Sequence, residues 1–168
     1  MKKRHGIYTV GGLMMVLLLA ACAAPGDAAA EGPTPSVSGP IEGTWIDATF
    51  EGDSVAIPLS TVESAVNVHF SVPVADRTLD FMAYVLGGTV QVRANACPPC
   101  HSRGFALDGT TLVCDMCATL FDARDGSGIE GACVGFPKAD SRYVIENGLI
   151  TMSVDDLTAA YDETLIAG

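Results

Sequence analysis

The sequence predicts a mainly β protein, a small β-sandwich or open barrel, and two observations lead to this prediction. From residue 45 onward, apolar and polar residues alternate with a period of two, which is typical of a strand with one buried face. Turn-forming steps such as Glu51-Gly52-Asp53, Gly87-Gly88 and Asn147-Gly148 separate these stretches. Short strands joined by tight turns favour sheet-on-sheet packing.

The expected strands follow one another along most of the chain. They cover residues 45–50, 54–58, 66–72, 79–85, 89–92, 142–145 and 149–152. We expect two short helices, a side-chain-capped turn at 60–63 and a helix at 154–161 that begins from Ser153. His69 occupies a polar position of its strand, so its side chain is expected to face solvent.

Five of the six cysteines lie in one window of the sequence. They form two C-x-x-C units, Cys97/Cys100 and Cys114/Cys117, followed by the single Cys133. Two thiolates three positions apart on a tight turn can face one metal ion, and a second unit of this kind completes a tetrahedron. The four paired cysteines are therefore the predicted metal ligands.

The segment between the two units predicts how they meet. Residues 105–107 and 110–113 are apolar stretches that flank Asp108-Gly109, a step typical of a two-residue hairpin turn. A hairpin at this position would bring Cys100 near Cys114.

Four kinds of chemistry are compatible with the paired cysteines. A single zinc or iron ion and an iron–sulfur cluster both need four deprotonated thiols. Covalent haem is the third, because C-x-x-C followed by His101 is the attachment pattern, although the second unit would then have no function. The fourth is a structural or redox-active disulfide. Metal or cluster binding is favoured, then disulfide chemistry, then haem; His101 and Cys133 are additional candidate ligands, and Cys133 is also a candidate resolving thiol.

Residues 1–21 have the pattern of a secretory signal peptide. A basic head precedes an apolar stretch from residue 7 to 21, which is shorter than the roughly 20 residues of a membrane-spanning helix. The stretch ends in Leu19-Ala20-Ala21-Cys22, which resembles the bacterial lipobox. This resemblance implies that Cys22 is lipidated and anchors the protein to the extracytoplasmic face of the cell membrane.

The remainder of the chain divides into a linker and one domain. Residues 22–40 are rich in Ala, Gly, Pro and Ser and predict a flexible linker, which leaves 41–168 as the folded domain. Cleavage before Cys22 would leave six basic and twenty acidic side chains, a net charge of −14. Such a surface repels nucleic acid and anionic lipid. Only two histidines remain, with no Ser/His/Asp set, so a metal-binding or electron-transfer protein is expected rather than an enzyme.

Two family resemblances meet on the cysteine-rich window. The layout from Cys97-Pro98-Pro99-Cys100 through Asp108-Gly109 to Gly126 resembles a Rieske domain. In that family each cluster-binding loop ends in histidine, whereas Cys100 and Cys117 stand near those positions here.

The closer resemblance is to the FtrD-like family of membrane iron–sulfur proteins, which are found beside ferrous-iron permeases. The matching segments are Ala96–Cys100, Gly104-Phe105, Val113–Phe121 and Gly131–Gly135, and with the strand-rich half before them the resemblance spans about residues 55–160. Ala132 and Val134-Gly135 depart from the glycine and Asn-Pro of the family.

The FtrD-like resemblance implies a lipid-anchored protein that binds a metal or iron–sulfur centre through paired cysteines. It also implies a role in electron transfer or metal handling for a membrane iron-uptake or redox system, with a permease or redox protein as partner. The alternative is a thiol–disulfide redox protein or a disulfide-stabilised binding lipoprotein.

Overall fold

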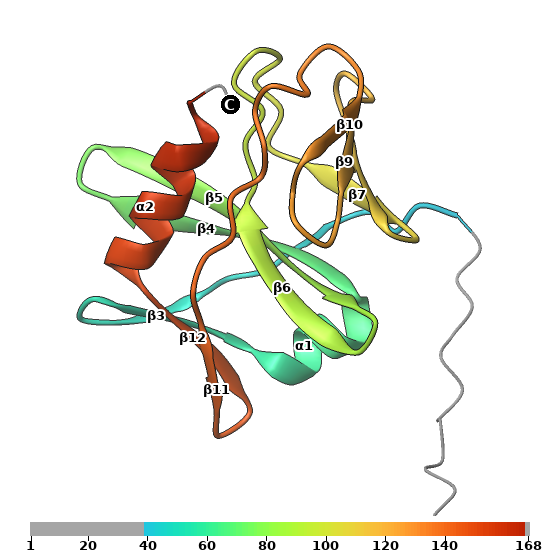
Figure 1. Cartoon of the computed structure of the whole chain (residues 1–168). Helices are drawn as coiled ribbons and strands as arrows, with labels where there is room; N and C mark the ends of the chain where they lie inside the picture. Colours follow the sequence, from blue (N-terminus) through green and yellow to red (C-terminus); the bar gives the residue numbers. More distant parts are fainter. Residues whose placement is uncertain (1–38, 167–168) are drawn as a thin grey trace, which may run out of the picture. The chain divides into compact units, whose positions relative to one another are not determined.

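The computed structural model describes residues 39–166, in which three four-stranded sheets and two helices are formed (Figure 1). The predicted signal peptide, Cys22 and most of the linker lie outside this range.

The outer sheet has the order β11 (Val144–Glu146), β12 (Leu149–Ser153), β3 (Ser54–Pro58), β2 (Thr49–Glu51). The central sheet has the order β1 (Thr44–Trp45), β4 (Asn67–Val74), β5 (Arg77–Leu86), β6 (Thr89–Ala94). The cysteine sheet has the order β10 (Gly128–Glu130), β9 (Leu120–Asp122), β8 (Thr111–Cys114), β7 (Phe105–Asp108).

Neighbouring strands are antiparallel except β1 and β4, which pair in parallel. The two helices are α1 (Leu59–Ala65) and α2 (Val154–Thr164). The mainly β fold class expected from the sequence is confirmed.

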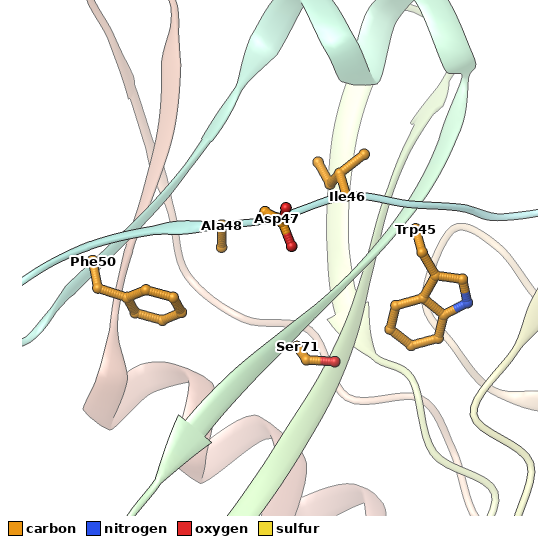
Figure 2. Close-up of a pocket in the computed structure, with 6 residues that line it drawn as sticks. All are labelled: Trp45, Ile46, Asp47, Ala48, Phe50 and Ser71. Atoms are coloured by element: carbon orange, nitrogen blue, oxygen red, sulfur yellow. The ribbon is translucent and has the colours of Figure 1, made fainter.

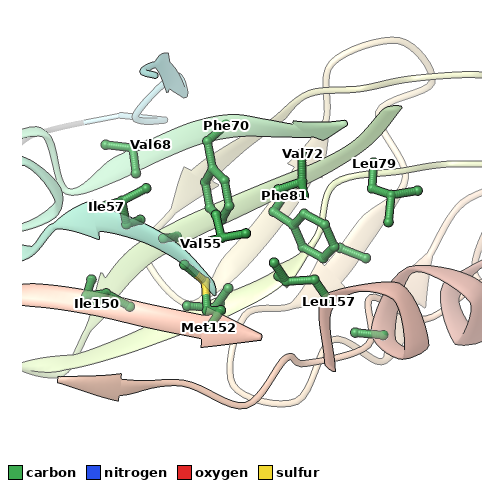
Figure 3. Close-up of a cluster of buried hydrophobic side chains, with 14 of the residues drawn as sticks. Val55, Ile57, Val68, Phe70, Val72, Leu79, Phe81, Ile150, Met152 and Leu157 are labelled. Atoms are coloured by element: carbon green, nitrogen blue, oxygen red, sulfur yellow. The ribbon is translucent and has the colours of Figure 1, made fainter. Parts of the chain in front are cut away.

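The first hydrophobic core lies between the central and outer sheets (Figure 3). Val68, Phe70 and Val72 project from alternate positions of β4, as the period of two predicts, and all three are fully buried. The outer sheet adds Ile57 and its neighbours, and α2 adds Leu157. These layers form the expected sandwich.

The second core lies between the opposite face of the central sheet and the cysteine sheet. Met82 and Tyr84 of β5 pack there with Phe105, Leu112 and the buried cysteines. The central sheet is therefore buried on both faces, which a strand pattern with one polar face does not indicate.

The prediction that His69 faces solvent is wrong, because its side chain is 1% exposed. A Cβ on Gly43 would overlap the His69 ring, and Trp45 packs edge-on against it with ring centroids 5.3 Å apart. Neither ring nitrogen has a hydrogen-bond partner among the described residues. The His69 ring thus faces protein instead of water.

Turn chemistry explains several element boundaries. Asn147 and Gly148 join β11 to β12 with φ of 52° and 77°, the left-handed pair that an Asn-Gly hairpin turn requires. The helix α2 begins where predicted, with the Ser153 hydroxyl accepting from the Asp156 N–H at 3.0 Å, and extends to residue 164. The capping predicted for α1 is wrong, since Pro58 stands at its N-cap without a side-chain hydrogen bond.

The hairpin between the two C-x-x-C units is present, formed by β7 and β8. Asp108 pairs with Thr111, so the turn residues are Gly109 and Thr110, one position later than predicted. Phe105 pairs with Cys114 at the other end, which brings the two halves of the cysteine window together.

Candidate metal centre

The first C-x-x-C unit forms a compact turn that we call the first turn (Cys97–Ser102). The Cys97 N–H donates to the Ser102 carbonyl at 3.0 Å, and the His101 N–H donates to the Cys97 carbonyl at 2.8 Å. His101 has a φ of 58°, in the left-handed region that histidine adopts more readily than most residues, and its side chain is exposed. These bonds hold Cys97 and Cys100 on one side of the turn.

The second unit repeats this construction and forms the second turn (Cys114–Thr119). The Cys114 N–H donates to the Thr119 carbonyl at 3.0 Å, and the Ala118 N–H donates to the Cys114 carbonyl at 2.9 Å. Ala118 has a φ of 54°, close to that of the equivalent residue in the first turn. Two turns with the same hydrogen bonds thus flank the β7–β8 hairpin.

Cys133 comes from a third loop (Gly131–Phe136) that the second turn holds in position. Its N–H donates to the Thr119 hydroxyl at 3.2 Å, and the same hydroxyl lies 3.2 Å from the Cys117 sulfur. Gly131 has a φ of +119°, and a Cβ there would lie 2.7 Å from the Thr119 hydroxyl oxygen. The third loop therefore needs glycine to pass this close to the second turn.

The three loops bring five sulfur atoms together. The Sγ atoms of Cys97, Cys100, Cys117 and Cys133 all lie within 4.8 Å of one another. Cys114 Sγ lies 3.6 Å from Cys100 Sγ, and Cys117 Sγ lies 3.6 Å from Cys133 Sγ. All five cysteines are free thiols in the structure. We call the first four sulfurs the closest group. Cys133, an additional candidate from the sequence, belongs to this group, whereas Cys114 of the predicted ligand set lies beside it.

Burial divides these thiols into two kinds. Cys97, Cys114 and Cys133 are buried, whereas Cys100 and Cys117 are half-buried. Desolvation raises the pKa of the Cys97 and Cys114 thiols. Desolvation also acts on Cys117, but hydrogen bonds from Thr119 and from neighbouring thiols outweigh it and lower the pKa of Cys117 to about 6. The hydroxyl of Thr119 thus lies where it stabilises the Cys117 thiolate.

The donor set fits a metal or iron–sulfur centre. Thiolates are the ligands that zinc, iron and iron–sulfur clusters share. A tetrahedral ion with sulfur bonds of about 2.3 Å has its sulfurs about 3.8 Å apart, and the 4.8 Å limit of the closest group is near this value. A cluster spreads its thiolates over several irons, so it would require some of these sulfurs to lie farther apart than around a single ion.

Haem attachment is less compatible with this arrangement. A thioether to haem would have to form at Cys97, which is 1% exposed and packed among other thiols. The second core would have to open to admit a porphyrin, because Cys97 belongs to it.

Sequence reasoning missed two buried cations beside the site, Lys138 and Arg93. Lys138 is 0% exposed, and its ammonium donates to the Ala96 carbonyl at 2.7 Å. Burial lowers the pKa of Lys138, while four of the thiols raise it. Arg93 donates to the Tyr84 hydroxyl at 3.0 Å and to the carbonyl of Lys138 at 2.9 Å. A lone lysine in an acidic chain was the available signal, since Lys138 is the only lysine after Lys3.

Two surface pockets lie near Trp45. The first has a volume of about 300 Å³ and is lined by Trp45, Ile46, Asp47, Ala48, Phe50 and Ser71 (Figure 2). The second, about 410 Å³, shares Trp45 and Ser71 and reaches Asp115 and Met116 of the second turn. None of these pocket residues is a cysteine or histidine, so the thiol cluster is the stronger candidate for the functional site.

A β domain that brings thiols from three loops together at one partly buried site has the construction of a thiolate metal-binding protein. The chain belongs to the family described as "Membrane iron-sulfur containing protein FtrD-like", whose model matches residues 62–163. The matched range contains all five clustered cysteines. The family expected from the sequence is confirmed, and the cofactor is one that a cysteine cluster holds, a metal ion or an iron–sulfur centre.

Three solved structures are similar to part of the chain. The ferredoxin of carbazole 1,9a-dioxygenase from Nocardioides aromaticivorans IC177 is 18% identical, with a TM-score of 0.47, covering 58% of this chain and 93% of that one. The complex of reduced oxygenase and oxidized ferredoxin in carbazole 1,9a-dioxygenase is 15% identical, with a TM-score of 0.43. The match covers 51% of this chain and 80% of that one. The Sphingomonas yanoikuyae B1 ferredoxin is 22% identical, with a TM-score of 0.41, and the match covers 49% of this chain and 83% of that one. No curated protein matches this chain.

Between residues 39 and 166, neither helix is both long enough and apolar enough to cross a membrane.

Proposed function

We propose that the protein is a lipid-anchored carrier of a thiolate-bound metal or iron–sulfur centre that transfers electrons or handles metal for a membrane iron-uptake or redox system. The convergence of five thiols from three loops is the observation that supports this most directly. The family description adds the membrane and the iron–sulfur centre. When iron is bound, such a centre accepts and donates one electron at a time.

For the ligands, we propose Cys97, Cys100, Cys117 and Cys133, with Cys114 beside them. The mutual distances of at most 4.8 Å between these four sulfurs support this set over the two C-x-x-C units alone. The hydrogen bond from the Cys133 N–H to Thr119 fixes the third loop against the second turn and so supports a structural reason for including Cys133.

The anchor and the domain boundaries belong to the same proposal. Residues 1–21 are the signal peptide, Cys22 carries the lipid, and the linker to residue 40 joins it to the domain at 41–168. On this basis the centre is displayed outside the cytoplasmic membrane, where a permease or redox protein is its partner. Replacing Cys22 with alanine should move the protein from the membrane fraction to the soluble fraction.

Metal analysis of the protein purified from its own membranes tests the centre. Iron with labile sulfide and charge-transfer bands indicates a cluster; iron without sulfide, or zinc in a colourless protein, indicates a single ion. Protein without metal, whose thiols titrate only after reduction, would overturn the proposal in favour of the thiol–disulfide alternative.

Two matched variants test the ligand set. Cys133→Ser should abolish stoichiometric metal binding, and Cys114→Ser, which removes an equally buried thiol of the second core, should retain it. The opposite pattern would restore the two C-x-x-C units as the ligand set.

A further inference from the structure

Lys138 is buried at the centre of the second core. Its ammonium lies 4.4 Å from the centroid of the Phe121 ring and 5.2 Å from that of Phe105, and its hydrogen bond is to the Ala96 carbonyl. Phe105 pairs with Cys114 across the β7–β8 hairpin, and Ala96 precedes Cys97. The cation is therefore fixed among the backbone and rings that support the cysteines.

This cation has no carboxylate partner. Among the described residues, no carboxylate oxygen lies within 4.0 Å of the Lys138 ammonium, although five ion pairs form elsewhere. One carbonyl and two aromatic faces compensate only part of the cost of burying a full charge. The buried cluster that contains the Phe105 and Phe121 rings also contains Cys97, Cys114 and Cys133, so thiols are the acidic groups of this core.

We infer that Lys138 is the internal counter-cation of the thiolate centre, an inference that rests on the proposed function. Four thiolates carry four negative charges, so a site with a divalent ion has a net charge of −2 before any neighbour is counted. A fixed positive charge in a low-dielectric interior stabilises this anion strongly. A pair of disulfides would leave the same lysine buried without an anion.

Two effects on the centre follow. Lys138 increases the affinity of the site for metal, because its positive charge attracts the anionic metal–thiolate complex. In an iron-loaded site it also favours the reduced state, because the added electron makes the centre more negative by one charge. Lys138 is thus a positioning and tuning residue that does not bind the metal itself.

The test compares Lys138→Met and Lys138→Gln with the wild type and with Arg142→Gln. Methionine keeps a long unbranched side chain, and glutamine keeps an N–H donor, so the loss they share is the charge. Arg142 is the control because its side chain is 88% exposed and its removal changes the net charge equally. Thermal melting verifies that each variant is folded.

The first measurement is a Co²⁺ titration of the reduced, metal-free full chain, followed by the thiolate-to-cobalt absorption. Both Lys138 variants should bind Co²⁺ at least about tenfold more weakly than the wild type, and the Arg142 variant should bind within about twofold. Folded Lys138 variants with wild-type affinity would overturn the inference. A wild type that binds no Co²⁺ and is isolated without iron or zinc would overturn the proposed function instead, so the two failures are distinguishable.

The second measurement is a spectroelectrochemical titration of protein isolated with iron. At a fixed electrode potential, the ratio of oxidised to reduced centre should rise about tenfold in both Lys138 variants, equivalent to a midpoint about 59 mV lower for one electron. The Arg142 variant should keep the wild-type midpoint. A midpoint that is unchanged or higher in the Lys138 variants would contradict the assigned role.

Discussion

Protonation of the buried His69 should make the domain unstable in mild acid. Burial lowers the pKa of His69 to about 4 from its ordinary 6.5, although the Phe105 carbonyl and the Asp80 carboxylate both raise it. The unfolded chain binds this proton below about pH 6.5, and the folded chain binds it only below about pH 4. The stability that neutral His69 provides is therefore complete above pH 6.5 and is lost as the pH falls to 4.

The size of this effect follows from the two pKa values. A difference of about 2.5 units corresponds to about 3.4 kcal/mol in full, of which about 2 kcal/mol is lost by pH 5. The ring is held against Gly43 and Trp45.

Guanidinium unfolding at about pH 7.5 and about pH 5 measures the effect, with His69→Leu as the variant that cannot titrate. Between these two pH values the wild type should lose about 2 kcal/mol more than the variant. His101→Gln, which removes an exposed histidine, is the matched control and should follow the wild type. Equal pH dependence in the wild type and the Leu variant, or an NMR titration of His69 centred near pH 6.5, would refute this reasoning.

Three further predictions concern the thiol site. Thr119→Val should raise the pKa of Cys117 above its value of about 6, because it removes a hydrogen bond to the thiolate. The rate of Cys117 alkylation in the reduced, metal-free protein, followed as a function of pH, measures this pKa. Gly131→Ala should destabilise the domain by about 1–3 kcal/mol and weaken metal binding, because its Cβ would overlap the second turn. The control Gly135→Ala has open space around its Cβ and should keep wild-type stability and metal affinity. Removing a metal that is present at about 100 times its Kd should lower the free energy of unfolding by about 2.7 kcal/mol, which corresponds to a fall of roughly 10 °C in melting temperature. An unchanged melting temperature after chelation would exclude a metal that stabilises the fold.

Local signals in the sequence were sufficient for much of the scaffold. The alternation in β4 and β5, the Asn147-Gly148 step and Ser153 before α2 each determine a structure through contacts within a few residues. The hairpin between the two C-x-x-C units was predictable for the same reason. Its turn shifted by one residue because Asp108 pairs with Thr111 and does not occupy the turn.

Features that depend on how the sheets and loops pack against one another were not predictable from the sequence. A polar residue on a strand is normally exposed, but Gly43 and Trp45 lie against the His69 ring, and so His69 is buried. Lys138 likewise follows no periodic pattern that would indicate burial, and only the packing of the second core identifies it. Cys133 was a candidate without an assigned role, because its position depends on Thr119, which lies 14 residues away in sequence.

One strand, β5, contributes side chains to both hydrophobic cores. Phe81 and Ala83 point into one and Met82 and Tyr84 into the other, and β5 is hydrogen-bonded to β4 and β6 along its length. Neither half of the domain can come apart without exposing one side of this strand. Amide protons of β5 should consequently exchange last with deuterated solvent, and the scaffold and the thiol-bearing half should melt together in one cooperative step.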